Sequence, residues 1–182
     1  MRPTLVTAAA DYPATLAEAR AWCRIETTVT DHDARLTLLL AGCTREIEVY
    51  LGRALVSQVW EGSTGAFSDE IELAPGPVLS IGHVKYYDAD NAQQTASSAL
   101  YMLDMTRDPQ RLALADGQSW PETFDRPDAV TVRFTAGYTP AALLADVKLA
   151  LLDLIAARFD AADEKTAEAI LRRLSGHRRI VI

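Results

Sequence analysis

The sequence predicts an α+β protein in which an α-helical bundle of about four helices carries an inserted small antiparallel β subdomain. Residues 31–53 place apolar side chains at the 3.6-residue spacing of an amphipathic helix. Between residues 55 and 138 apolar residues instead alternate with polar ones, and turn-forming residues separate the runs. Helical spacing then returns. Four parts are expected: an N-terminal helical part (1–54), the β-rich insertion (55–138), C-terminal helices that complete the bundle (139–176) and a docking tail (177–182).

The ends of the first two helices are marked by individual residues. Thr15 and Glu18 match a capping box, in which the Thr15 hydroxyl accepts from the Glu18 backbone N–H while the Glu18 side chain reaches back. Thr30 or Asp31 is expected to cap the second helix, and Gly52 to end it. The side chains expected to face inward are Leu16, Ala19, Trp22 and Cys23 in the first helix, and Leu36, Leu39, Leu40, Cys43, Ile47, Tyr50 and Leu51 in the second.

The middle of the chain is expected to form short antiparallel strands. The candidate strands are residues 55–61, 70–73, 79–88, 100–103, 111–114 and 130–136. Residues 88–91 and Asp116-Gly117 are expected to be hairpin tips, and Pro75-Gly76-Pro77 a rigid turn. Short strands at this spacing favour a small antiparallel sheet over an alternating βαβ fold.

Two further helices are expected after this region. Pro140 is expected at the start of the third helix, which covers about residues 141–160. Gly176 is expected to end the fourth helix, which begins near residue 163. The third helix has an apolar face that is broader than one neighbouring helix needs. This face consists of Leu143, Leu144, Val147, Leu151, Leu154, Ile155 and Phe159.

Composition and charge exclude several classes of protein. The net charge of −7 and the pI near 4.9 argue against a free-standing nucleic-acid binder, which normally has a basic surface. No apolar run approaches the roughly 20 residues that span a bilayer, and the N-terminal apolar stretch is too short for a signal peptide. We therefore expect that the protein does not associate with a membrane and that it is made in the bacterial cytoplasm. Cys23 and Cys43 are expected to be reduced residues of the core.

No motif in the sequence predicts catalysis. His32, His83 and His177 lack Ser, Cys or carboxylate partners at the spacing of a triad or a metal site. Residues 62–65 (GSTG) lack the Lys-Ser/Thr of a phosphate-binding loop. We expect no catalytic residue, no cofactor and no metal ion, and hence a protein that is not an enzyme.

The C-terminus combines positive charge with an apolar end. Arg172, Arg173, His177, Arg178 and Arg179 occur there without a carboxylate, and Ile180-Val181-Ile182 follow. A free terminus is usually polar and frayed, so this composition favours docking of the tail. Docking to another chain, docking to the sheet of its own chain and disorder are the three alternatives.

The order of these motifs resembles the head–tail connector (adaptor) proteins of tailed phages, in the gp6-like branch found in prophages and gene transfer agents. The resemblance extends from about residue 16 to residue 159. It is carried by Thr15-Leu16-Ala17-Glu18-Ala19 with Trp22, Asp31-x-Asp33, Tyr50-Leu51-Gly52-Arg53-Ala54-Leu55, Gln58-Val59-Trp60, Ile71-x-Leu73-x-Pro75-x-Pro77-Val78, Ile81-x-x-Val84-x-Tyr86-Tyr87-Asp88-x-Asp90, Trp120-Pro121 and Val132-x-Phe134-x-Ala136-Gly137-Tyr138.

This resemblance implies a structural protein of the virion neck. Such connectors form an oligomeric ring, commonly of twelve copies, beneath the portal and extend the DNA channel toward the tail. The implied partners are further copies of the chain, the portal protein and the next neck or tail component, while DNA passes through without specific binding. A net-acidic duct would suit that passage, because like charges deny phosphates the gain from counterion release.

Specific residues are then candidates for these contacts. Portal docking is expected through Arg178, Arg179, Ile180, Val181 and Ile182, and packing between subunits through Leu143, Val147, Leu151 and Ile155. The candidates for acidic surfaces of the duct are Glu46, Glu48, Asp153 and Asp160. Two alternatives stay open: another virion ring component, such as a stopper or tail-completion protein, or a small enzyme or regulatory domain in which His83 or His32 meets carboxylates in a pocket.

Overall fold

The computed structural model describes residues 1–139 and 142–179. The helices are α1 (Leu16–Trp22), α2 (Asp33–Leu51), α3 (Ala145–Phe159) and α4 (Glu164–Arg172), with the short 3₁₀ helices η1 (Ser98–Leu100) and η2 (Ser175–His177). The strands are β1 (Arg2–Thr7), β2 (Gln58–Thr64), β3 (Glu70–Glu72), β4 (Val78–Tyr87), β5 (Gln93–Thr95), β6 (Tyr101–Asp104), β7 (Arg111–Leu114) and β8 (Val130–Ala136). The predicted α+β fold with four helices and antiparallel strands is confirmed.

The chain folds into two compact units, and neither unit is continuous in sequence. The β unit contains residues 1–9 and 57–137, and the helical unit contains residues 10–56 and 138–182. The sequence predicts that residues 1–9 belong to the N-terminal helical part. They belong to the β unit instead, because β1 pairs with β2 in antiparallel register, with Thr4 opposite Glu61.

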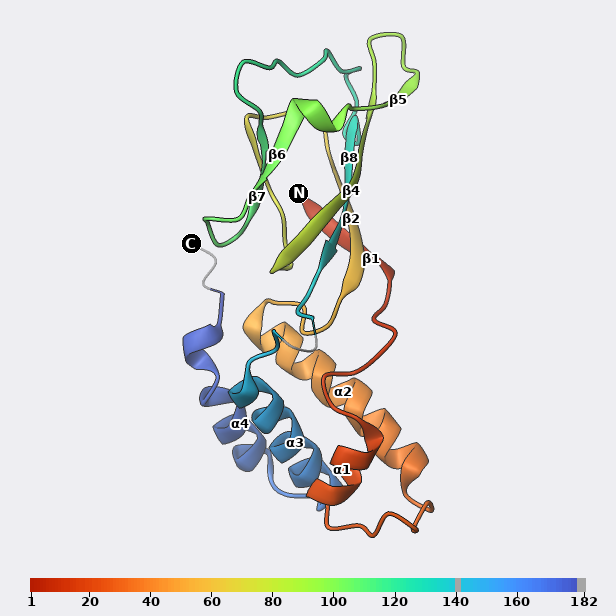
Figure 1. Cartoon of the computed structure of the whole chain (residues 1–182), viewed down its shortest axis with the longest axis vertical. Helices are drawn as coiled ribbons and strands as arrows, with labels where there is room; N and C mark the ends of the chain where they lie inside the picture. The colour runs from red at the N-terminus through yellow and green to blue at the C-terminus, as the bar shows by residue number, and fades with distance from the viewer. Residues whose placement is uncertain (140–141, 180–182) are drawn as a thin grey trace. The chain divides into compact units, whose positions relative to one another are not determined.

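The helical unit is built around the apolar stripe of α2. Figure 1 shows the course of its helices. α2 packs against α3, α1 packs against both, and α4 packs against α3. Five of the seven predicted α2 residues are buried, whereas Leu39 and Tyr50 are partly buried against the same core. Their partners on the other helices include Ala19, Val147, Leu151, Ile155 and Ile170. Trp22 differs from the prediction: its side chain is 42% exposed, because the indole lies at the surface and its N–H donates to Asp153.

The helix ends follow the sequence prediction at Thr15 and Gly52 but not at the start of α2 or the end of α4. α4 ends at Arg172, and Gly176 lies in η2. The predicted start of the third helix at Pro140 lies outside the described residues. The capping box is present: the Thr15 backbone N–H donates to Glu18 Oε2 at 2.8 Å, and the Glu18 N–H donates to Thr15 Oγ1 at 3.2 Å. Gly52 ends α2 in the left-handed conformation at φ +66°. The predicted cap of α2 was wrong, because His32 occupies that position without a side-chain bond and the Thr30 carbonyl accepts from Asp33 in a preceding turn.

The β unit contains two antiparallel sheets. One has the strand order β1-β2-β8-β4-β5 and the other β3-β7-β6. β8 lies between β2 and β4, and its residues at alternate positions are buried, as the sequence predicts for Val130, Val132 and Phe134. Ala136 continues the same buried face. The six predicted strands are present, with shifted ends in several cases, and β1 and β5 are additional.

The two predicted hairpin tips have different outcomes. Residues 88–91 join β4 to β5, and Asp88 Oδ1 accepts from the backbone N–H groups of Asp90 and Ala92. Asp116-Gly117 is a turn but not a hairpin tip, because β7 before it and β8 after it lie in different sheets. The hairpin in this region is formed instead by β6 and β7.

An aromatic cluster holds the long loop before β8 against the rest of the β unit. The rings of Phe67 and Trp120 stack with a centroid distance of 4.3 Å, and Tyr86 and Tyr101 flank this pair. The Trp120 indole N–H donates to the Ser68 carbonyl at 3.0 Å. The Trp120-Pro121 motif therefore has a packing role within the unit.

Candidate interface surfaces

The first residues of the predicted docking tail are bound to their own helical unit. The Arg179 N–H donates to the Leu51 carbonyl at 2.8 Å, and Arg53 Nε donates to the His177 carbonyl at 3.0 Å. The Arg178 guanidinium lies 5.4 Å from the centroid of the Tyr50 ring. The tail is thus fixed at the C-terminal end of α2 as far as Arg179. The other predicted docking residues, Ile180, Val181 and Ile182, lie outside the described residues.

A second contact holds the same segment to α3. His177 Nε2 lies 2.6 Å from Asp146 Oδ2. This hydrogen bond holds the pKa of the Asp146 carboxyl below its usual value. The positive charge near the C-terminus therefore has a structural function within the subunit in addition to the docking predicted for it.

The four residues predicted to pack between subunits lie in or beside the core of the helical unit. Val147, Leu151 and Ile155 are buried there, and Leu143 is partly buried against the same cluster. Their side chains contact the other helices of their own subunit. A buried side chain is already covered, so exposed apolar groups elsewhere are better placed to meet a neighbouring copy.

The predicted acidic residues of the duct are mostly engaged in contacts within the helical unit. Glu46 Oε1 binds Arg158 at 2.9 Å, and the buried Glu48 accepts from the Leu55 N–H at 3.0 Å. Asp153 binds both Trp22 and Arg173 through its two oxygens. Asp160 is exposed at the C-terminal end of α3.

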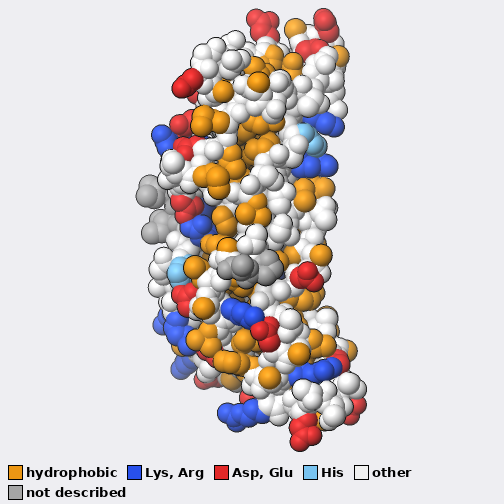
Figure 2. Space-filling model, in the orientation of Figure 1, with side chains coloured by type: hydrophobic (Ala, Val, Ile, Leu, Met, Phe, Trp, Pro, Cys, Tyr) orange, Lys and Arg blue, Asp and Glu red, His pale blue; other side chains and the backbone are white. Residues whose placement is uncertain are grey.

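The two units differ in net charge, which the sequence alone did not reveal. The β unit has 6 Lys and Arg against 12 Asp and Glu, a net charge of −6, whereas the helical unit has 12 against 13, a net charge of −1. Together they account for the total of −7. On the face in view, acidic and basic side chains are interspersed with apolar ones (Figure 2). The acidic surplus of the chain therefore belongs almost entirely to the β unit.

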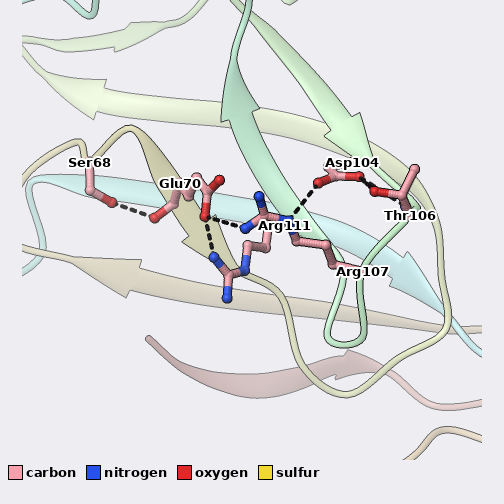
Figure 3. A network of polar contacts seen from close by, with 6 residues as sticks. All are labelled: Ser68, Glu70, Asp104, Thr106, Arg107 and Arg111. Carbon is pink, nitrogen blue, oxygen red and sulfur yellow. Dashed lines mark hydrogen bonds and ion pairs between the residues drawn. The ribbon is translucent and has the colours of Figure 1, made fainter.

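A polar network braces the hairpin between β6 and β7 (Figure 3). Glu70 Oε2 binds both Arg107 and Arg111, so one carboxylate of β3 holds two arginines from this hairpin. Asp104 Oδ1 accepts from the Thr106 N–H at 2.9 Å, and its other oxygen lies 3.5 Å from Arg107. The pKa of Asp104 is lowered by these hydrogen bonds, the Thr106 hydroxyl first.

This braced hairpin exposes two methionines. Met102 on β6 and Met105 in the turn have more than half of their side-chain surface exposed. No sequence pattern marks these two residues, because isolated methionines in a polar turn show no hydrophobic periodicity. The β6–β7 hairpin, with the exposed Met102 and Met105, is therefore a surface suited to contact with another protein.

The three histidines are far from the arrangement of a catalytic site. His32 contacts the Phe159 ring edge-on, and His177 binds Asp146. His83 Nε2 lies 3.6 Å from Glu61 on the surface of the larger sheet, and burial lowers its pKa, as do Arg133 and Lys85. Within the described ranges, no three His, Cys, Asp or Glu side chains form a group that could hold a metal ion. None of the helices in the described ranges combines the length and apolar character needed to cross a membrane.

Comparisons with known proteins bear on the family of the chain. A comparison with curated proteins found no match. The chain is similar along its whole length to a chain of the neck of an empty GTA particle computed with C6 symmetry, at 24% identity, 97% coverage of that chain and a TM-score of 0.76. A chain from the virion of a native gene transfer agent (GTA) particle is 24% identical, with 97% of that chain covered and a TM-score of 0.74. A chain from the neck of a native GTA particle computed with C12 symmetry is 25% identical, with 97% of that chain covered and a TM-score of 0.68.

The sequence itself matches a family model. The model describes the phage gp6-like head–tail connector protein, and it matches residues 13–111 of this chain. This range includes the capping box at Thr15, the long helix α2 and the strands from β2 to the start of β7. The resemblance inferred from the motif order is therefore confirmed, and the chain belongs to the phage gp6-like head–tail connector family.

Proposed function

We propose that this connector is a ring-forming structural subunit in the neck of a phage or phage-like particle, where it joins the head to the tail without performing catalysis. The observation that carries the proposal is the match to a neck chain of a native GTA particle computed with C12 symmetry. All of this chain and 97% of that one are covered, at 25% identity. The family match gives independent support for the connector role.

The proposed assembly contains several copies of the chain, twelve by analogy with the C12 symmetry of that neck. Its proposed partners are the portal protein on one side and the next neck or tail component on the other. Two compact units suit such a position, because two different surfaces can then be devoted to two different partners.

The charge distribution supports a path for DNA through the ring. The β unit has a net charge of −6, and a surface of like charge gives DNA phosphates no gain from counterion release. We propose that acidic residues of this unit, rather than the paired Glu46, Glu48 and Asp153, keep DNA from adhering as it passes.

We also propose that the C-terminal tail docks to the portal through Arg178, Arg179, Ile180, Val181 and Ile182. The anchored segment 177–179 gives this tail a fixed point of departure at the end of α2. Two truncations separate docking from folding. Removal of residues 180–182 keeps the anchoring contacts and should abolish portal binding alone, whereas removal of residues 177–182 should also lower the stability of the helical unit. Full portal binding by both truncated chains would refute the role of the tail.

Native mass spectrometry tests the proposed function as a whole. The purified chain is measured alone and then mixed with the portal protein encoded in the same genome. A closed ring of about twelve copies, alone or only on the portal, is the expected result. A chain that stays monomeric and does not bind the portal would refute the proposal.

A further inference from the structure

The long helix α2 has two apolar faces, and its own subunit covers only one of them. Leu36, Leu40, Cys43, Ile47 and Leu51 are at most 3% exposed. At about 100° per residue, a second set of side chains lies about 180° around the helix from these. This set is the α2 outer face, and it consists of Leu38, Gly42, Arg45 and Val49.

The α2 outer face is strongly exposed. The side chain of Leu38 is 74% exposed and that of Val49 is 64% exposed, which are the two largest values among the exposed large apolar residues. Between them, a Cβ added to Gly42 would meet no described atom within 4 Å. The face is therefore an open apolar surface with a shallow centre, where another chain could approach the helix closely.

Most of the charged side chains of α2 do not lie on the α2 outer face. Asp33 binds Arg20, Arg35 donates to the Phe159 carbonyl, and Glu46 binds Arg158, all within the subunit. Glu48 is buried, and this leaves Arg45 as the charge on the outer face, 3.5 Å from Glu48. A solvent-facing helix normally places its charges outward.

The short helix α4 provides the internal comparison. Its exposed side is formed by Glu164, Lys165, Glu168 and Arg172, as expected for a helix that faces water. The same chain thus has one helix with a charged outer side and one with an apolar outer side. The difference indicates that α2 is covered in the assembled state.

A second exposed apolar surface is formed by α3 and the C-terminal end of α1. Leu149, 44% exposed, lies on the side of α3 that faces away from its buried residues. Asp153 is one turn further along the same side and accepts from the indole N–H of Trp22, which is 42% exposed. We call Leu149 and Trp22 the α3 outer patch. The two apolar surfaces differ in composition and lie on different helices.

We propose that the α2 outer face of one copy packs against the α3 outer patch of the next copy. The inference rests on the proposed ring and identifies its subunit contact. A ring is built from head-to-tail contacts, in which two different surfaces of one chain meet on neighbouring copies. Two unlike apolar surfaces on different helices of the unit meet that requirement, whereas a single self-complementary patch would produce a closed pair.

Cysteine labelling tests the contact directly. Leu38→Cys and Leu149→Cys are made separately and reacted with a maleimide, first as free chains and then in the assembled ring. Ala169→Cys, on the exposed side of α4, is the matched control. Cys43 contributes little labelling, since burial raises its pKa to about 12. Loss of labelling at positions 38 and 149 on assembly, with unchanged labelling at 169, is the expected result.

Cross-linking then identifies which surfaces meet. The double variant Leu38→Cys, Leu149→Cys treated with a short bismaleimide should give a ladder of covalent oligomers from assembled rings. Each single variant gives no ladder, because position 38 does not meet position 38 in a head-to-tail contact. A ladder from the Leu38→Cys variant alone would overturn the proposed pairing.

A charge substitution provides the functional readout. Leu38→Asp should abolish ring formation while the helical circular dichroism stays unchanged, because Leu38 contributes little to its own core. Ala169→Asp adds the same charge on α4 and should leave the ring intact. If the wild-type chain forms rings and Leu38→Asp forms them equally well, the contact is refuted while the connector function stands. If the wild-type chain never assembles on the portal, the ring itself and this contact both fail.

Discussion

Replacing Glu48 by Ala is expected to lower the free energy of unfolding of the helical unit by about 2 kcal/mol. Glu48 is only 7% exposed, and its Oε1 accepts from the N–H of Leu55, itself 1% exposed, at 3.0 Å. The Ala variant leaves this buried N–H without that acceptor, and an orphaned buried donor costs about 1–3 kcal/mol. The Leu55 contact also fixes the chain where it leaves α2.

Glu48→Gln is the matched control, because its side-chain oxygen can still accept from Leu55. We expect this variant to lose less than about 1 kcal/mol, since it keeps the acceptor and removes only the charge. Urea titration followed by helical circular dichroism measures both variants against the wild-type chain. If Gln and Ala destabilise equally, the charge of Glu48 matters and the hydrogen bond does not, and the reasoning is refuted.

Three further substitutions test other parts of the fold. Trp120→Ala should destabilise the β unit by about 2 kcal/mol, because the half-buried ring loses its stacking on Phe67, and Trp120→Phe should restore most of this in urea titrations. Asp146→Asn should reduce the dependence of the unfolding free energy on pH at acid pH, because the pKa of Asp146 is lower in the folded chain than in the unfolded chain. The ionised carboxylate stabilises the fold above its unfolded pKa of about 4, and this stabilisation is lost as the pH falls through the folded pKa. The unfolding free energies of the wild-type chain and the variant, measured by urea titration across this pH range, should therefore converge at low pH. Gly52→Ala should cost about 1–2 kcal/mol at φ +66°, and Gly52→Asn less, as thermal unfolding would show.

The elements that the sequence predicts best are those with one buried face. The stripe from Leu36 to Leu51 and the alternation in Val130–Ala136 both match the structure, because burial on one side imposes a period on the residues. The sequence does not predict β1 and β5, because neither strand has one buried face that would impose such a period. Both are edge strands of the larger sheet, and their exposed side chains show no alternation of polar and apolar residues.

The interface residues were harder to predict than the fold. Hydrophobic periodicity identifies the side chains that are buried. It does not show whether the same subunit or a neighbouring subunit buries them. Val147, Leu151 and Ile155 had the strongest apolar pattern and fill the core of their own subunit. The exposed Leu38 and Leu149 carried no such signal. Pairs such as Glu46 with Arg158 join residues 112 positions apart, a separation that spacing rules do not reach.

The interleaved arrangement of the two units has a consequence for synthesis of the chain. The polypeptide passes between the units after residues 9, 56 and 137. β1 emerges from the ribosome first, yet β8, which joins β2 to β4, is made only after residue 129. Likewise α2 exists long before α3, its main partner in the core. A chain that terminates before residue 137 therefore completes neither unit, and one that terminates soon after it completes only the β unit. Translation must be nearly finished before a competent building block exists.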